Sequence, residues 1–174
     1  MKNISLIDED FMDFPIGEFP YDKNHSAMGE YHFIHYPGFY GRWYDPVCNY
    51  RYNGQGASWC IMEYNGRHYM EQMRLHNTEP HRTFPTLETG DRFWRDYDIE
   101  AGLRMFNTKW GSAGIGFCAQ NSLNLLACIF EDKKLKLVYR HKEDVEEIKS
   151  VDFDYNCDDT YNICLLYTSD AADD

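Results

Sequence analysis

Residues 36–52 carry aromatic side chains beside planar polar ones, a combination that suits sugar recognition. A sugar ring presents apolar C–H faces and a rim of hydroxyl groups, so its binding site needs flat rings together with hydrogen-bonding side chains. Proline and glycine punctuate this segment and favour loops, where binding residues tend to lie. The same aromatic residues could instead fill the core and cover the edge of the fold, and both interpretations stay open. The candidate carbohydrate-binding side chains are Tyr40, Arg42, Trp43, Tyr44, Asp45 and Tyr50.

A second polar group follows an asparagine-glycine pair at positions 65–66, which is a strong signal for a two-residue hairpin turn. Arg67, His68 and Glu71 together would suit an anionic sugar. On the opposite arm of the hairpin, Glu63 could face Glu71 and supply the carboxylate pair that glycoside hydrolysis needs. Solvated acids and a surface histidine are the alternative interpretation. Lyase chemistry needs a base and a neutralising cation or arginine, and these types occur without a diagnostic spacing. No catalytic residue is therefore assigned.

Metal and cofactor chemistry finds little support in the sequence. Asp8, Asp10 and Asp13 supply oxygen ligands of the kind that calcium takes, but the glycine of an EF-hand loop is missing. An acidic, solvated terminus is the alternative interpretation. The cysteines match no zinc pattern and, without a secretory signal, are expected as free, mostly buried thiols. We predict no metal and no cofactor, with a structural calcium as the open alternative.

The formal net charge of −12 argues against a nucleic-acid partner. Phosphate binding needs a basic face, whereas lysine and arginine are scattered singly along this chain, so neutral sugars and cationic groups remain as ligands. Residues 1–13 contain acids where a signal peptide needs an apolar run of roughly 7–15 residues, and no segment approaches the about 20 apolar residues of a membrane span. The sequence thus predicts a cytoplasmic protein without a membrane partner.

Short, regularly spaced strands dominate the predicted secondary structure. In residues 96–106 apolar side chains occupy every second position and charged ones most of the positions between them, which indicates a strand with one wet face. Residues 143–151, although charged, favour another short strand. An aromatic content of 17% suits pleated, half-buried surfaces, and 174 residues leave room for one core. We predict an all-β fold, an antiparallel β-sandwich in which helices are minor.

Two hairpins are predicted from paired runs. Residues 58–64 and 67–75 flank the asparagine-glycine turn and form the stronger case. Residues 123–130 are continuously apolar, and residues 134–140 alternate after a polar turn, so these two runs read as a second hairpin. Residues 114–119 are small and apolar, which is typical of a central strand.

Residues 164–174, CLLYTSDAADD, break with the composition that precedes them. Their reverse translation resembles the transposon end and adapter of sequencing libraries, read through in frame. A natural acidic tail is the alternative interpretation. We expect the natural sequence to stop near Ile163, so that residues 1–163 form one β-sandwich domain that is truncated at its C-terminal end.

Several blocks of the chain resemble concanavalin A-like lectin and glucanase domains. These blocks are DEDFMDFPIGEFP, RFWRDYDIEAGLRMF and GIGFCAQNSLNLLACIFEDKKLKLVYRHKE, and DFDYNCDDTYNI resembles the approach to a next strand. The middle of the chain, EYHFIHYPGFYGRWYDPVCNYRYNG with GRHYMEQMR, resembles N-terminal β-sandwich modules of rhamnogalacturonan lyase-like and other polysaccharide-degrading proteins. The resemblance implies a jelly-roll fold that binds glycans on a concave sheet. It also implies a structural calcium in some members and glycoside hydrolase activity in some branches.

One departure from that family bears on catalysis. The glucanase branch carries an acidic cluster of the Glu-x-Asp-x-x-Glu kind on one strand, whereas Asp96, Asp98 and Glu100 alternate here without the third acid at the spacing of that cluster. The predicted function is a carbohydrate-binding or structural module of a larger polysaccharide-degrading protein. Its expected partners are an oligo- or polysaccharide and the downstream domains of the same protein. Two alternatives remain, a truncated glycoside hydrolase or polysaccharide lyase domain and a sandwich that binds only proteins.

Overall fold

The computed structural model describes residues 5–19, 38–40, 43–45, 59–72, 86–91, 93–105, 112–142 and 144–168. Within these ranges the regular elements are all β-strands and no helix occurs, which confirms the prediction of an all-β, antiparallel fold. The chain divides into two compact units, unit 1 (Met1–Gly90) and unit 2 (Asp91–Asp174). The expectation of a single domain over residues 1–163 stays a prediction. No helix in the described ranges is long and apolar enough to cross a membrane.

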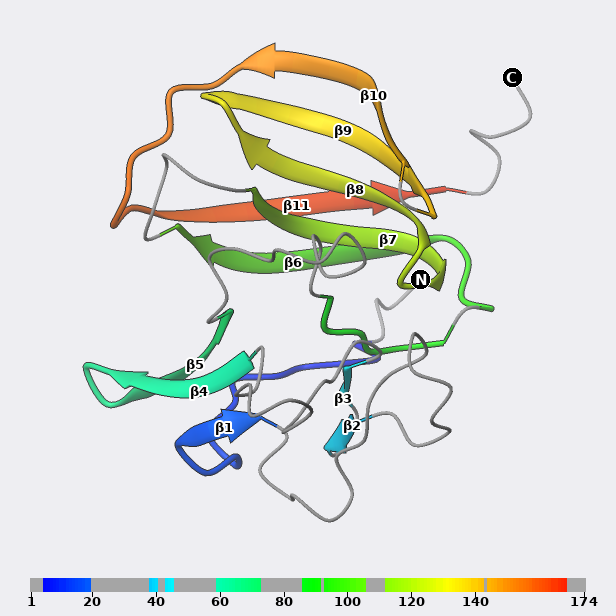
Figure 1. Ribbon diagram of the computed structural model, residues 1–174. Helices are drawn as coiled ribbons and strands as arrows, with labels where there is room; N and C mark the ends of the chain where they lie inside the picture. Colours follow the sequence, from blue (N-terminus) through cyan, green and yellow to red (C-terminus); the bar gives the residue numbers. More distant parts are fainter. Residues whose placement is uncertain are drawn as a thin grey trace, which may run out of the picture. The chain divides into compact units, whose positions relative to one another are not determined.

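Unit 1 contains a three-stranded antiparallel sheet with the order β1-β4-β5 (Figure 1). A separate antiparallel pair joins β2 to β3. In the larger sheet β4 lies between two partners, and its Ile61 is only 1% exposed. The strands of unit 1 are β1 (Gly17–Phe19), β2 (Gly38–Tyr40), β3 (Trp43–Asp45), β4 (Trp59–Tyr64) and β5 (Arg67–Gln72).

The hairpin predicted around the asparagine-glycine pair is confirmed. Asn65 and Gly66 separate β4 from β5, and their φ angles are 51° and 73°. Two successive left-handed residues make a type I′ turn, which asparagine and glycine adopt at low cost and whose twist matches that of the strands. The turn sets the register, so Tyr64 pairs with Arg67 and the following pairs are determined.

Unit 2 contains a four-stranded antiparallel sheet with the order β10-β9-β8-β7 and an antiparallel pair of β6 and β11 (Figure 1). In the larger sheet each strand pairs with the next one in the chain, as short hairpin connections require. The strands of unit 2 are β6 (Tyr97–Arg104), β7 (Ala113–Asn121), β8 (Asn124–Glu131), β9 (Lys134–His141), β10 (Asp144–Asp152) and β11 (Thr160–Tyr167).

Strand β6 shows the alternation that the sequence predicts. Along residues 97–103 half-buried side chains alternate with exposed positions, so that Ile99 lies on one side and Asp98 and Glu100 on the other. A helix would have brought these acids and apolar residues onto shared faces. Strand β10 likewise confirms the short strand expected over residues 143–151.

The second predicted hairpin is confirmed with a less common turn. Asp132 and Lys133 join β8 to β9 with φ angles of 52° and 58°, so two left-handed residues again make the turn, here without glycine. The expectation of a central strand at residues 114–119 is wrong, because β7 lies at the end of the order of described strands. Its small residues have another cause. A Cβ on Gly114 would lie 2.0 Å from the Cys128 carbonyl oxygen, so only glycine allows this approach.

One apolar core joins both sheets of unit 2. Phe130 of β8 and Tyr155, which follows β10, are 2% and 0% exposed, and their ring centroids lie 5.3 Å apart. Leu103 of β6, Ile163 of β11 and Leu135 of β9 pack against this cluster. Side chains from both sheets therefore meet in one core, as in layered β folds. The jelly-roll, concanavalin A-like connectivity stays a prediction.

Strand β11 continues beyond the expected end of the natural sequence. Its residues 164–167 pair in register with residues 97–100 of β6. Leu165 is half-buried whereas Leu166 is 75% exposed, so these residues keep the alternation of the strand. The adapter interpretation concerns the origin of this segment and stays a prediction.

The described cysteines include free thiols, as expected. Cys118, Cys128 and Cys157 are half-buried rather than fully buried, and Cys164 is exposed. Burial raises the pKa of the Cys128 thiol, which keeps it in its protonated, less reactive form at neutral pH. Cys48 lies outside the described residues.

Candidate functional site

The predicted sugar-binding residues of unit 1 fall partly on described strands. The register of β2 and β3 makes Tyr40 the direct partner of Trp43. Tyr44 and Asp45 follow Trp43 along β3. Arg42 and Tyr50 lie outside the described residues.

Trp43 is held in place by the N-terminal turn. Its indole Nε1 donates a hydrogen bond to Glu9 Oε2 at 3.1 Å, and its ring centroid lies 5.5 Å from that of Phe11. The other carboxylate oxygen of Glu9 accepts the backbone N–H of Phe11 at 2.9 Å. One carboxylate therefore fixes both the turn and the half-buried indole. Phe11 has a φ of 60°, a left-handed conformation that costs a non-glycine residue energy and that this hydrogen bond helps to maintain.

The same turn reaches His68 on β5. The His68 ring Nδ1 lies 3.1 Å from the Phe11 carbonyl oxygen, and the His68 backbone N–H donates to Met12 Sδ at 3.4 Å. A carbonyl oxygen only accepts, so Nδ1 carries the proton and Nε2 keeps its lone pair when the ring is neutral. Trp43 and His68, which the sequence analysis placed in separate groups, thus contact one turn.

The acidic pair expected across the β4–β5 hairpin does not form. Glu63 pairs with His68, and Glu71 pairs with Cys60. Partners in register share a face and successive residues alternate, so Glu63 and His68 lie on one face while Arg67 and Glu71 lie on the other. The expected facing of Glu63 and Glu71 is therefore wrong. The same alternation separates His68 from the two other members of its predicted cluster.

The N-terminal acids cap the turn within the chain. Asp10 Oδ1 accepts the backbone N–H of Met12 at 3.1 Å, the same local role that Glu9 has for Phe11. Among the residues that the structure describes, no group of three or more histidine, cysteine, aspartate or glutamate side chains could hold a metal ion. The structure thus gives Asp10 a turn-capping role, and Asp8 and Asp13 belong to no ligand group within that part of the chain.

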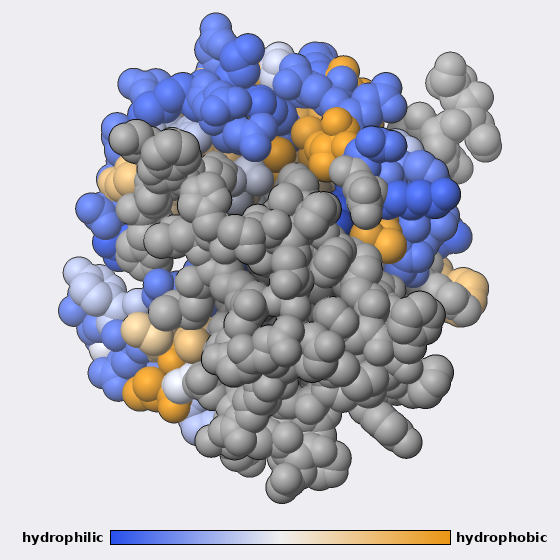
Figure 2. Space-filling view, viewed as in Figure 1, coloured by the Kyte–Doolittle hydropathy of each residue, from blue (hydrophilic) through white to orange (hydrophobic). Residues whose placement is uncertain are grey.

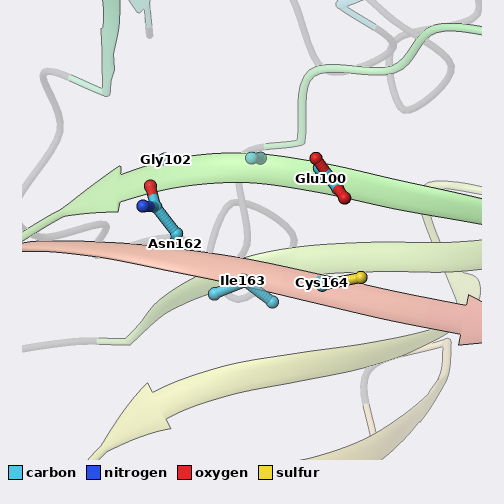
Figure 3. A pocket seen from close by; sticks show the side chains of 6 residues that line it. Glu100, Gly102, Asn162, Ile163 and Cys164 are labelled. Atoms are coloured by element: carbon cyan, nitrogen blue, oxygen red, sulfur yellow. The ribbon is translucent and has the colours of Figure 1, made fainter.

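Unit 2 has an open depression on the outer side of β6 and β11. Its volume is about 460 Å³, and it forms where Gly102 has no side chain (Figure 3). Figure 3 shows the Asn162 side chain reaching from β11 toward Gly102. Gly102 occupies the next position in step with Asp98 and Glu100, so the row of acids on this face ends there. The lining residues are Glu100, Ala101, Gly102, Asn162, Ile163 and Cys164, without an aromatic ring on which a sugar could pack.

A β-bulge in β7 brings a thiol to two phenols. Cys118 has a φ of 51°, and its backbone N–H donates to the Tyr97 hydroxyl oxygen at 3.1 Å. The rings of Tyr97 and Tyr167 lie 5.3 Å apart. Burial raises the pKa of the Tyr97 hydroxyl, so this group stays neutral and hydrogen-bonded at physiological pH. The cluster ties β7 to β6 and accounts for the strained bulge.

A polar row that no sequence pattern indicated lies at one end of the four-stranded sheet. The register aligns Asn121 of β7, Asn124 of β8, His141 of β9 and Asp144 of β10. Partners in register share a face, so these side chains are neighbours although they are spread over three hairpins. The alternation around the predicted second hairpin could have identified the β8 and β9 members, because its turn length sets their register.

Comparisons with protein-family models, with curated proteins and with solved structures find no match to this chain.

Proposed function

We propose that this chain is a carbohydrate-binding module of the concanavalin A-like type, part of a larger cytoplasmic protein that degrades polysaccharides. The observation that carries the proposal is the fixed position of Trp43, whose indole is bound by Glu9 and packed against Phe11. The β2–β3 register adds Tyr40 as its direct neighbour. A sugar ring binds best to an aromatic side chain whose position is fixed before binding and that has polar groups beside it.

Preorganisation explains why this contact matters energetically. Ordering a side chain on binding costs roughly 0.5–1.5 kcal/mol, and rigid ligating groups avoid that cost. The Trp43 indole is ordered by one hydrogen bond and one ring contact before any ligand arrives. Strand-borne side chains also keep their position better than loop-borne ones, and Trp43 lies on β3. These features support binding without requiring a catalytic group.

The direct test is affinity electrophoresis of the full chain against a panel of soluble plant and bacterial polysaccharides. We expect retardation by at least one polysaccharide, and a loss of about tenfold or more in affinity for Trp43→Ala, since full burial of a large apolar side chain contributes about 1.5–3 kcal/mol. Trp43→Phe keeps a ring but loses the N–H donor, so its affinity should lie between the two.

The matched control is Tyr64→Ala, which removes an exposed aromatic ring from the end of β4 in the same unit. It should bind like the wild type. If no polysaccharide in the panel retards the protein, the proposed function is excluded. If Trp43→Ala and Tyr64→Ala lose the same affinity, Trp43 is not the residue responsible for binding.

A further inference from the structure

Two rows of side chains cross the same face of the four-stranded sheet in unit 2. The polar row contains Asn124, His141 and Asp144, which are partners in register across β8, β9 and β10. The next row on that face contains Leu126, Tyr139 and Glu146, again partners in register. One row therefore offers polar groups, and the other an apolar and an aromatic side chain followed by the Glu146 carboxylate, side by side on three strands.

A chain of hydrogen bonds fixes the polar row. The backbone N–H of Leu123 donates to Asn121 Oδ1 at 2.9 Å, so that oxygen is an acceptor. Asn124 Nδ2 donates to the same oxygen at 2.9 Å, which leaves Asn124 Oδ1 turned toward His141. His141 Nδ1 lies 2.8 Å from that oxygen.

This chain decides the tautomer of His141. An amide oxygen only accepts, so Nδ1 must donate and the neutral ring keeps the lone pair on Nε2. The His141 and Tyr139 rings are stacked, with centroids 6.0 Å apart and planes 27° from parallel. The imidazole is thus positioned by Asn124 on one side and by Tyr139 on the other, and it presents an acceptor to solvent.

Two further polar groups in these rows are acceptors, and the next row on the face, in which Leu137 pairs with Lys149, adds an exposed cation. Asp144 and Glu146 are exposed partners of His141 and Tyr139, and Tyr139 itself is 37% exposed. Figure 2 shows hydrophilic residues over much of the visible surface of the upper part of the molecule, with apolar patches between them. An aromatic ring beside two carboxylates and a nitrogen lone pair favours a ligand whose polar groups donate hydrogen bonds. The two carboxylates outnumber the neighbouring Lys149, so their net charge disfavours an anionic ligand.

We propose that this face of β8, β9 and β10 binds a saccharide that lacks carboxylates, with the sugar ring against Tyr139 and its donor groups on His141 Nε2, Asp144 and Glu146. Asn124 is the positioning residue for His141. The inference rests on the proposed function and deepens it, because it adds a site in unit 2 and limits the ligand to neutral or amino sugars. The formal net charge of −12 acts in the same direction.

The experiment is calorimetric titration of the full chain with three probes: a neutral β-glucan oligosaccharide, a chitosan oligosaccharide and an oligogalacturonate. We expect binding of at least one of the first two and at least about tenfold weaker binding of the oligogalacturonate. Tyr139→Ala and His141→Ala should each weaken binding of that probe by about tenfold. Phe93→Ala, which removes a ring 70% exposed elsewhere in unit 2, is the matched control and should leave affinity unchanged.

Asn124→Ala tests the positioning role by a readout that a merely structural role would not change. The ¹⁵N shifts of the His141 ring should show the Nδ1–H tautomer in the wild type and a mixture of tautomers in the variant, with affinity reduced by about threefold to tenfold. Far-UV circular dichroism should be unchanged.

The outcomes separate the two proposals. If the wild type binds none of the probes and no polysaccharide of the wider panel, the proposed function fails and this inference fails with it. If the wild type binds but Tyr139→Ala and His141→Ala bind equally well, only the unit 2 site fails. If oligogalacturonate binds as tightly as the neutral probe, the proposal that the ligand lacks carboxylates is wrong.

Discussion

Units 1 and 2 position their candidate side chains in different ways. In unit 1 the turn at residues 11–14, with the Glu9 carboxylate that caps it, holds Trp43 and His68, so the arrangement depends on side-chain contacts between segments far apart in the sequence. In unit 2 Asn124, His141 and Asp144 become neighbours through the register of successive hairpins. Register depends on backbone pairing and turn length. A site built on register should therefore tolerate the loss of one side chain better than a site built on distant contacts.

The largest expected effect comes from the core that keeps the two sheets of unit 2 together. Phe130→Ala removes a ring that is 2% exposed and contacts Phe153, Tyr155 and Tyr161. Its free energy of unfolding should fall by about 3–5 kcal/mol, from lost burial and the cavity left behind. Urea denaturation followed by circular dichroism measures this. The control Phe93→Ala should stay within about 0.5 kcal/mol of the wild type, and a Phe130→Ala result equally small would mean that the described core does not stabilise unit 2.

Substitutions at two glycines of unit 2 test how far stability depends on close pairing of the strands. Gly114→Ala places a Cβ 2.0 Å from the Cys128 carbonyl oxygen, so β7 must move away from β8, at a cost of about 1–3 kcal/mol. Gly102→Ala places its Cβ 3.6 Å from the nearest atoms, which is ordinary contact, and its unfolding free energy should be nearly unchanged. Amide hydrogen exchange should show faster exchange along β7 and β8 only in the first variant. Equal stability of the two variants would contradict the described β7–β8 approach.

Unit 1 also contains one element set by backbone conformation alone. Gly66 has a φ of 73° and no atom within 4 Å of an added Cβ, so Gly66→Ala tests strain without a clash. We expect a loss of roughly 1–2 kcal/mol, the cost of a left-handed alanine. Thermal denaturation measures it. An unchanged midpoint would show that the hairpin turn can adopt another conformation.

The hydrogen bonds of Glu9 in unit 1 should have a smaller effect on stability. Glu9→Gln keeps the shape of the side chain but removes the charge from its hydrogen bonds to Trp43 and Phe11, which should cost about 1 kcal/mol. Tryptophan emission should change with it, because the indole N–H loses its anionic acceptor. The control Asp13→Asn should alter neither signal, and identical spectra for Glu9→Gln would argue that Trp43 is held by other contacts.

The smallest effect leaves stability unchanged and concerns reactivity. Burial raises the pKa of the Cys128 thiol, which lowers its thiolate fraction at any pH below that value, whereas Cys164 is exposed on β11. We expect iodoacetamide at pH 8 to modify Cys164 several-fold faster than Cys128, with the difference shrinking as pH rises. Mass spectrometry of the digested protein resolves the two sites. Faster labelling of Cys128 would mean that β8 opens to solvent.

Most of the secondary structure follows from local pattern. Alternation along residues 97–103 and the turn chemistry of Asn65-Gly66 suffice to predict β6 and the β4–β5 hairpin, because side-chain period and left-handed φ angles are local properties. The place of β7 in its sheet could not be predicted, since strand order depends on which edges meet. The expected Glu63–Glu71 pair failed for a simpler reason. Counting outward from a two-residue turn pairs Glu63 with His68, so the register of the hairpin excludes a Glu63–Glu71 pair.

The candidate sites were less predictable than the strands. Aromatic content marked the segment that contains Trp43, but nothing local to that segment indicates Glu9 as the acceptor of its indole proton. The polar row of unit 2 was overlooked because Asn121, Asn124 and Asp144 look like ordinary turn residues when each is considered alone. Their common face appears only when three hairpin registers are combined.

By itself the sequence determined β6, β10, the β4–β5 and β8–β9 hairpins and the all-β class, because backbone propensity and side-chain alternation act between near neighbours. The tertiary structure decided which distant groups share a hydrogen bond or a core: Glu9 with Trp43, Phe11 with His68, and Phe130 with Tyr161. These contacts depend on how strands already formed come together, and that choice is governed by burial and packing summed over many residues rather than by any local pattern.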